Sequence, residues 1–275
     1  MIWLLRRIFN DLRHWDRPTQ IAFGLAVVLL IIGVVLAVLA PQEQRMNVII
    51  GVGGLLIVAE VAVLWGSRGM VTAYTQAQRL YLNGDLEQAR ELLESARATG
   101  KADMRVLTLL GSTYRQLGRL DESAAILYEA LNKAPEHHFP LYNLGRTLLA
   151  QGKYAESANL IARALEAGAP AVVRFDLGEA FYWMGDSERA AEHLLKVQPT
   201  LSEPHRQLMA AWMLHRIKQS DPPDSRLIDT GILYWDAAAD RFAETSYGQG
   251  VSEELRALKA VMSQRARNVH TSSTN

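Results

Sequence analysis

Residues 109–135 read LLGSTYRQLGRLDESAAILYEALNKAP, and small and large apolar residues recur along this stretch at helical spacing. The positions that carry the spacing are Gly111, Tyr114, Gly118, Ser123, Leu127 and Ala130. Residues three and four positions apart share one face of a helix, so the small residues let two helices touch while the large ones fill the space between them. The stretch therefore predicts two packed amphipathic helices joined by a turn at Gly118.

The same pattern recurs on both sides of this stretch. A glycine falls at intervals of 34, 34 and 33 residues, at Gly84, Gly118, Gly152 and Gly185. Five positions after each glycine stands a small residue, and four positions further an aliphatic one. These residues are Ala89, Ser123, Ser157 and Ala190, followed by Leu93, Leu127, Ile161 and Leu194. A repeat of this length built from two helices predicts an α-solenoid.

These repeats resemble those of the tetratricopeptide-repeat family, and the unit from Leu110 to Pro135 matches the family pattern nearly position by position. The first unit departs from it with Ala77 where the family prefers glycine, and the last two units lack the closing proline at its usual place. The resemblance covers about residues 70 to 202. It implies an all-α protein in which residues 70–218 form a solenoid of about four repeats. The expected units are 70–103, 104–137, 138–170 and 171–204, followed by a divergent helix.

Two further helices are predicted in residues 219–267, where helical spacing returns at Ile228–Phe242 and Ser252 begins a helix that runs to about Arg267. Residues 268–275 are polar and are expected to be disordered. The C-terminal helices either cap the solenoid or fold back into its groove. We expect capping, because an exposed terminal repeat leaves apolar surface in water.

An N-terminal transmembrane hairpin is predicted over residues 19–66. Residues 19–40 carry no charge, and residues 47–66 carry only Glu60. A helix of 22 residues is roughly 33 Å long, enough to cross a hydrocarbon core of ~30 Å. A cleaved signal peptide is the rival interpretation of the first run, although such a peptide has a shorter apolar core of ~7–15 residues.

The arginines before the first run predict the orientation of this hairpin. They are Arg6, Arg7, Arg13 and Arg17. Since basic residues favour the cytoplasmic side, both termini and the repeats are expected in the cytoplasm, with the protein integral to the inner or plasma membrane. Residues 1–18 form either an amphipathic helix in the membrane interface or an ordinary positively charged flank. Glu60 is an intramembrane polar candidate, for contact with a partner or a proton, or else a neutral acid.

The resemblance implies a partner-binding groove on the concave face, lined by the first helix of each unit. Carried over position by position, the candidate residues are Arg105, Arg115, Tyr142, Arg146, Phe175, Tyr182 and Trp183. Aromatic and arginine side chains are typical interface anchors, so the expected partner is a protein or peptide with apolar anchors and an acidic group. The alternative is that the aromatic rings pack between repeats. Thr108, Tyr142 and Phe175 stand where the family's carboxylate clamp has lysine or a polar residue, which disfavours a clamp of that kind.

The composition and motifs of the sequence do not indicate catalysis, metal binding or nucleic-acid binding. Lysine plus arginine equals aspartate plus glutamate at 29 each, so nucleic acid is not an expected partner. There is no cysteine, and no phosphate-binding loop, nucleophile elbow or metal-ligand histidine spacing, so we expect no enzyme activity, metal or cofactor. Three functions remain. In order of preference they are a membrane-anchored interaction scaffold or assembly factor, an accessory subunit of a larger membrane complex held by its hairpin, and an enzyme too divergent to recognise.

Overall fold

The computed structural model divides the chain into two compact units, Met1–Thr72 and Ala73–Asn275. The residues that it describes are 28–29, 31–33, 35–36, 38–39, 41–54, 57, 73–100, 102–217 and 220–272, with side chains up to Ser263. All regular structure in these ranges is helical, and none of it is a strand, which confirms the predicted all-α class.

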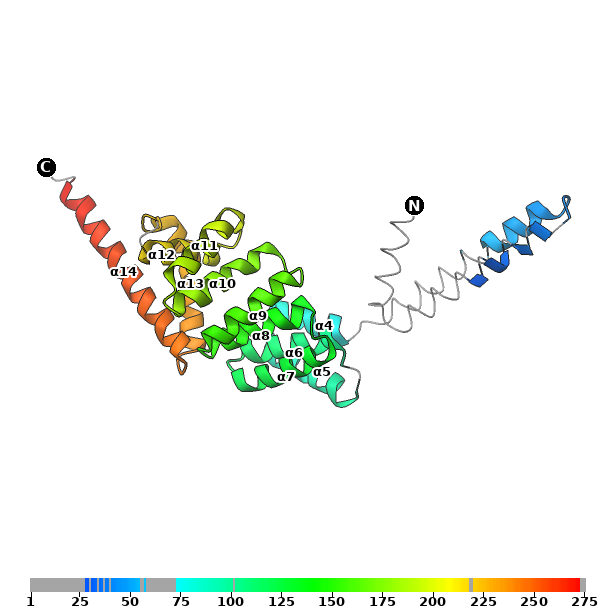
Figure 1. The fold of residues 1–275 in the computed structure, drawn as a ribbon, viewed down its shortest axis with the longest axis horizontal. Helices are drawn as coiled ribbons and strands as arrows, with labels where there is room; N and C mark the ends of the chain where they lie inside the picture. Colours follow the sequence, from blue (N-terminus) through cyan, green and yellow to red (C-terminus); the bar gives the residue numbers. More distant parts are fainter. Residues whose placement is uncertain are drawn as a thin grey trace. The chain divides into compact units, whose positions relative to one another are not determined.

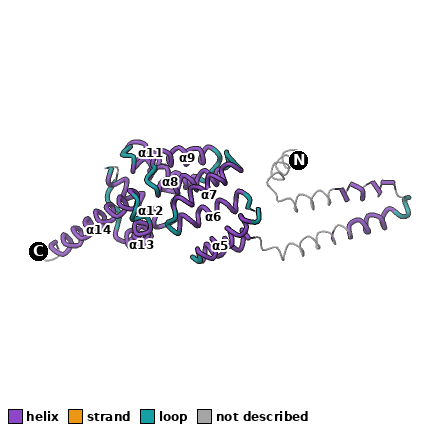
Figure 2. Tube along the Cα trace, turned by 90° about the horizontal axis from the view of Figure 1, so that it is seen from below, coloured by secondary structure: helices purple, strands orange, loops and turns teal. Residues whose placement is uncertain are grey.

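The described part of the first unit is a helical hairpin. Helical backbone before Pro41 and after Gln44 runs side by side, as Figure 2 shows. The Pro41 carbonyl accepts hydrogen bonds from the backbone N–H groups of Gln44 and Arg45 at 2.9 and 3.0 Å, which forms the turn. Gly33 is buried, and a Cβ atom placed there would collide with Val52. The two stretches therefore pack directly against each other through a small residue.

The large apolar side chains of this hairpin are mostly exposed. They are Val28, Ile31, Ile32, Val35, Leu36, Val38, Leu39, Met46, Ile49, Ile50 and Ile57. Among the described residues, no helix combines the length and the apolarity needed to cross a membrane. Residues 1–18, Glu60 and the outer parts of both predicted spans lie outside the described residues.

The second unit is a succession of helices joined by short connections (Figure 1). In chain order they are α4 (Ala73–Asn83), α5 (Leu86–Ala98), α6 (Met104–Gln116), α7 (Leu120–Lys133), α8 (His138–Ala150), α9 (Tyr154–Glu166), η1 (Ala171–Val173), α10 (Arg174–Trp183), α11 (Ser187–Val197), η2 (Gln198–Thr200), α12 (Pro204–Arg216), α13 (Ser225–Arg241) and α14 (Ser246–Ser272).

Helices α4 to α11 form four consecutive pairs, and the packing within each pair follows from the periodic residues. The turns are made by Gly84, Gly118, Gly152 and Gly185, whose φ angles of 87°, 76°, 80° and 78° lie in the left-handed region that favours glycine. Within the pair α6–α7, a Cβ atom at Gly111 would collide with Leu127, which is fully buried. Gly145 and Gly178 stand in the same relation to Ile161 and Leu194. The predicted roles of the small and aliphatic positions are therefore confirmed.

Capping of the solenoid end was the arrangement expected for the C-terminal helices, but α13 and α14 do more than this. Their buried residues include Trp235, Val251 and Leu255, which belong to the same apolar core as Phe175 of α10 and Leu208 of α12. Helix α14 begins at Ser246, ahead of the predicted Ser252, and its backbone is helical to Ser272. The C-terminal segment thus folds back onto the first helices of the later repeats and is an integral part of the core.

Candidate partner-binding face

The concave face of the third and fourth repeats is covered by the chain's own C-terminal helices. The Tyr247 hydroxyl of α14 donates a hydrogen bond to Glu179 of α10 at 2.8 Å. The Tyr182 hydroxyl of α10 donates to Glu254 of α14 at 2.7 Å. A Cβ atom at Gly250 would lie 2.7 Å from the Trp183 ring, so this ring packs against the α14 backbone. In this structure a partner has no direct access to that part of the groove.

The predicted groove residues therefore differ in their surroundings. Phe175 is 2% exposed and Arg115 is 7% exposed, so both belong to the interior. Tyr142, Arg146, Tyr182 and Trp183 are half-buried and contact residues of this chain. Arg105 is exposed on the first turn of α6. Of the seven candidates, the structure leaves Arg105 freely accessible to solvent.

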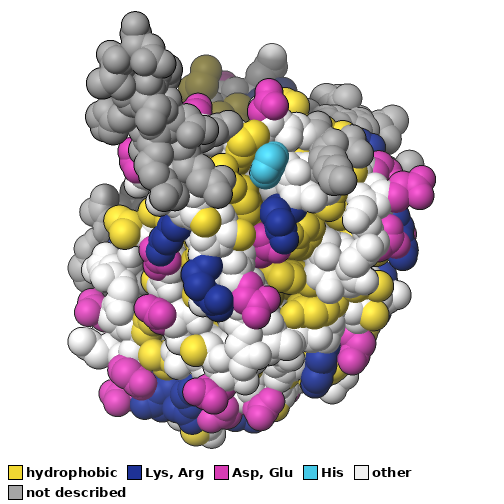
Figure 3. All heavy atoms as spheres, turned by 90° about the vertical axis from the view of Figure 1, so that its left-hand side faces the viewer, with side chains coloured by type: hydrophobic (Ala, Val, Ile, Leu, Met, Phe, Trp, Pro, Cys, Tyr) yellow, Lys and Arg dark blue, Asp and Glu magenta, His cyan; other side chains and the backbone are white. Residues whose placement is uncertain are grey.

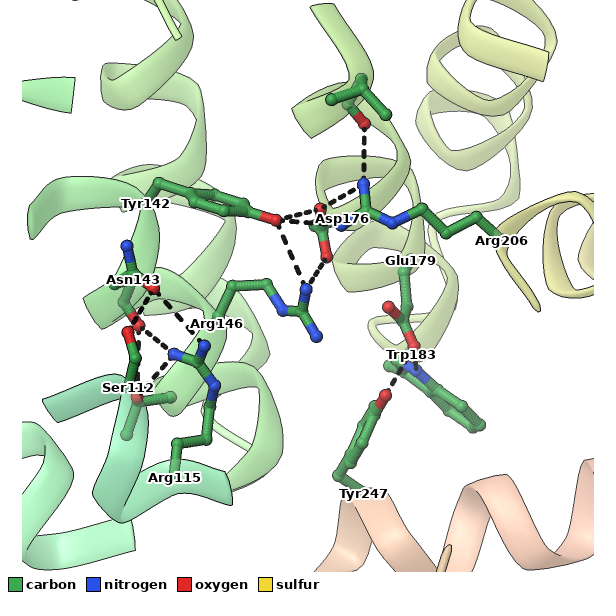
Figure 4. Close-up of polar contacts among 12 residues, drawn as sticks. Ser112, Arg115, Tyr142, Asn143, Arg146, Asp176, Glu179, Trp183, Arg206 and Tyr247 are labelled. Atoms are coloured by element: carbon green, nitrogen blue, oxygen red, sulfur yellow. Dashed lines mark hydrogen bonds and ion pairs between the residues drawn. The ribbon is translucent and has the colours of Figure 1, made fainter. Parts of the chain in front are cut away.

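An ionic network centred on Asp176 joins three helices. Arg146 Nη1 lies 3.1 Å from Asp176 Oδ1, and Arg206 Nη1 of α12 lies 3.6 Å from Oδ2. The Tyr142 hydroxyl donates to Oδ2 at 2.8 Å. Burial opposes the charge on Arg146, but the Asp176 carboxylate outweighs this effect and holds the pKa of Arg146 well above its ordinary value. Figure 4 shows this carboxylate between the two guanidinium groups.

Arg115 is buried in a different way. Its Nη1 donates to the backbone carbonyl of Asn143 at 3.0 Å, and its Nη2 lies 3.4 Å from Asn143 Oδ1. No acidic side chain of the described residues forms an ion pair with it. Burial, followed by repulsion from Arg146, lowers the pKa of Arg115. This guanidinium is therefore held by neutral acceptors alone.

Glu179 is a buried carboxyl group on the covered face. Its Oε1 accepts hydrogen bonds from the Tyr247 hydroxyl at 2.8 Å and from Trp183 Nε1 at 3.5 Å. Burial, followed by repulsion from Asp176, raises the pKa of Glu179 to about 7. The contact between α10 and α14 therefore includes a group that changes its charge near neutral pH.

The inner face of α4 and the beginning of α6 remain accessible. The Arg105 guanidinium lies over the Tyr74 ring, 5.2 Å from its centroid, and its side chain is 61% exposed. Tyr74 and Tyr81 are half-buried, and Gln78 is exposed. We call this surface, made by Tyr74, Gln78, Tyr81 and Arg105, the open end of the concave face. It offers a partner two aromatic rings and the Arg105 guanidinium, whose Nε lies 3.6 Å from Asp103 Oδ2.

Little on the described surface points to catalysis. Within the described ranges no group of three or more histidine, aspartate and glutamate side chains is placed to hold a metal ion. His205 stacks on Tyr234 at 3.9 Å between ring centroids, and His193 stacks on Phe181 at 5.5 Å. On the face that Figure 3 shows, basic and acidic side chains are interspersed, so it presents no large patch of one charge sign.

Comparisons with known proteins support the repeat assignment. The family model described as tetratricopeptide repeat matches residues 74–138 and 142–202, and it supports membership of that family. Among the solved structures that match this chain is a MamA fragment from Desulfovibrio magneticus RS-1, with 20% identity, a TM-score of 0.47 and coverage of 67% of this chain and 94% of that one. A putative kinesin light chain of Podospora anserina has 20% identity, a TM-score of 0.43 and coverage of 69% and 94%.

One curated protein, the rhomboid protease GluP of Bacillus subtilis, is 35% identical over 69 residues. The match includes 25% of this chain and spans only 14% of the length of that protein.

Sequence reasoning missed the groups that tie the C-terminal helices to the solenoid. They are Trp212, Tyr247 and Glu254, and the sequence also did not single out Asp176 and Arg206, which join α10 to α12. Asp176 and Glu179 stand within the otherwise apolar run FDLGEAF at residues 175–181, which was the one available signal. Carboxylates on the buried face of a helix need a partner, but the sequence did not identify which element supplies it.

Proposed function

We propose that the protein is a membrane-anchored interaction scaffold or assembly factor that binds a partner protein through the open end of its concave face. The observation that carries the proposal is that α13 and α14 fill the later part of the groove while Tyr74 and Arg105 stay accessible. Aromatic rings and guanidinium groups provide much of the binding energy in protein interfaces. A partner segment with an apolar anchor and an acidic group matches this surface, since the anchor packs on the rings and the acid pairs with Arg105.

The membrane anchor is proposed from two features. Residues 19–40 and 47–66 are long apolar runs, and the described part of the hairpin exposes large apolar side chains such as Ile31, Leu39 and Ile50. Exposed apolar surface of this extent calls for an apolar environment. With the arginines ahead of the first run on the cytoplasmic side, the repeats face the cytoplasm.

The test is an affinity purification from membranes solubilised in a mild detergent. The full-length protein is compared with a Tyr74→Ala, Arg105→Ala variant, and bound proteins are identified by mass spectrometry. The matched control is Tyr128→Ala, Arg163→Ala, which removes the same two residue types from the second helices α7 and α9, where both side chains are partly exposed. We expect a partner that is reduced at least about tenfold by the first variant and unchanged by the second.

The accessory-subunit function gives a different result. It is favoured by the exposed apolar side chains of the hairpin, which also suit packing against other membrane helices. In that case partners persist with the Tyr74→Ala, Arg105→Ala variant and are lost when residues 19–66 are exchanged for an unrelated membrane hairpin. That result would replace the scaffold proposal.

A further inference from the structure

The second unit holds three buried or half-buried arginines close to two buried carboxyl groups, Asp176 and Glu179. Arg115, Arg146 and Arg206 lie in or beside the covered part of the concave face. Arg146 and Arg206 share the single carboxylate of Asp176, and Arg115 has no acidic partner within the described residues. A buried charge is costly unless another charge compensates it. The neutral acceptors on Asn143 satisfy hydrogen bonds of Arg115 but leave its charge unbalanced.

A small cavity lies next to this unbalanced charge, where α13 and α14 meet α6 and α8. Its volume is about 20 Å³. That is enough for one occupant of about the size of a water molecule. Polar side chains that line it are Arg115, Gln116, Arg146, Tyr234, Arg241 and Tyr247, and no acidic side chain lines it. Guanidinium, amide and hydroxyl groups all supply hydrogen-bond donors.

The neighbouring carboxylates are already engaged. Glu179 accepts the hydroxyl of Tyr247 and the indole N–H of Trp183, and Asp176 is held by Arg146 and Arg206 (Figure 4). Arg241 of α13, which donates to Gln116 of α6 at 2.6 Å, brings a further positive charge to the cavity from the C-terminal segment. The cavity is thus a junction of positive groups from two parts of the fold.

We propose that this cavity binds a single monatomic anion, chloride in the cell, which balances Arg115 and joins the C-terminal helices to the second and third repeats. The cavity volume of about 20 Å³ is too small for phosphate or sulfate. Charge-assisted hydrogen bonds from the guanidinium groups provide the binding energy. The proposal concerns the interior and is independent of the partner-binding function.

The experiment compares the thermal unfolding of the full-length protein in a mild non-ionic detergent, in sodium chloride and in sodium gluconate at equal ionic strength. Gluconate is too large for the cavity, so it serves as the reference anion. We expect the unfolding temperature of the wild type to be about 3–5 °C higher in chloride, because a ligand that binds only the folded state stabilises it. The ³⁵Cl NMR signal should also broaden on addition of wild-type protein.

The Arg115→Gln variant separates an anion site from a purely structural role. Because the substitution removes an unbalanced charge, the variant should be at least as stable as the wild type in gluconate. Its unfolding temperature should be the same in chloride, and its addition should not change the ³⁵Cl line width. Arg105→Gln, which removes an exposed arginine outside the cavity, should keep the full chloride effect. If Arg115→Gln does not fold, Arg241→Gln provides the test, because its exposed side chain lines the same cavity and its loss should weaken the chloride effect several-fold.

Two results would overturn the proposal. One is a wild-type protein whose unfolding temperature is the same in chloride and in gluconate, and whose addition does not change the ³⁵Cl line width. The other is an Arg115→Gln variant destabilised equally in chloride and gluconate, which would identify Arg115 as a hydrogen-bonding residue without an anion.

Discussion

Glu179 shows how one buried residue links folding to pH. Its carboxyl group lies between α10 and α14, and burial raises its pKa to about 7 from an ordinary value of 4.5. The folded state therefore holds a proton on this group more tightly than the unfolded state does. The stability that this proton provides is fully present below pH 4.5 and is lost as the pH rises to about 7.

We predict that Glu179→Gln removes this pH dependence. Glutamine keeps an acceptor for the Tyr247 hydroxyl but stays neutral, so the variant should match the wild type near pH 4.5 and exceed its stability above pH 7, by at most about 3 kcal/mol. Urea unfolding of both proteins at several pH values between 4.5 and 8 measures the difference. A gap between the two proteins that does not change with pH contradicts the assignment.

Helix α14 is held on the solenoid by Glu254. This carboxylate accepts hydrogen bonds from the Tyr182 hydroxyl at 2.7 Å and from Trp212 Nε1 at 2.8 Å, and Arg216 Nε lies 3.1 Å from it. Groups from α10 and α12 thus converge on one residue of α14. Its apolar neighbours Val251, Leu255 and Leu258 are buried beside it.

We predict that Glu254→Ala loosens α14 locally. The substitution leaves the Tyr182 hydroxyl and the Trp212 indole N–H without their acceptor, which should cost about 2–3 kcal/mol. Hydrogen exchange followed by mass spectrometry should show faster exchange in α14 and no change in α6 and α7. Glu253→Ala is the matched control, since Glu253 is the adjacent residue and is exposed. Equal exchange in both variants would show that Glu254 does not hold the helix.

At the scale of the whole molecule, the chain combines an apolar hairpin in Met1–Thr72 with a solenoid in Ala73–Asn275 that has its own core. The solenoid buries its apolar residues, whereas the described part of the hairpin exposes them. This contrast is the basis of the proposed membrane anchor.

We predict that the full-length protein stays in the membrane fraction after extraction with sodium carbonate, and that residues 73–275 expressed alone are recovered in the soluble fraction. The reason is that the described part of the hairpin exposes most of its large apolar side chains, whereas the solenoid buries most of its own. An unrelated membrane hairpin in place of residues 19–66 should restore membrane retention, which controls for loss of the solenoid's own contacts. Release of the full-length protein by carbonate would contradict the proposed anchor.

The solenoid could be predicted from the sequence because its signals are local and repeated. The second, third and fourth units each place a glycine against an aliphatic residue within one pair of adjacent helices. These pairs are Gly111 and Leu127, Gly145 and Ile161, and Gly178 and Leu194. Contacts between neighbouring elements follow from helical periodicity, so the period, the turn glycines and the packing positions were all predictable.

The open and covered parts of the concave face were decided only by the tertiary structure. Tyr247 and Glu179 are 68 positions apart, and Tyr182 and Glu254 are 72 apart. Helical periodicity contains no signal for such distant pairs. The amphipathic pattern of the C-terminal helices showed that each needs a core, but several surfaces of the solenoid could have provided one. Hence the sequence determined the repeats and a candidate groove, whereas the long-range packing of α13 and α14 determined that Phe175 and Arg115 are interior residues and that Arg105 faces solvent.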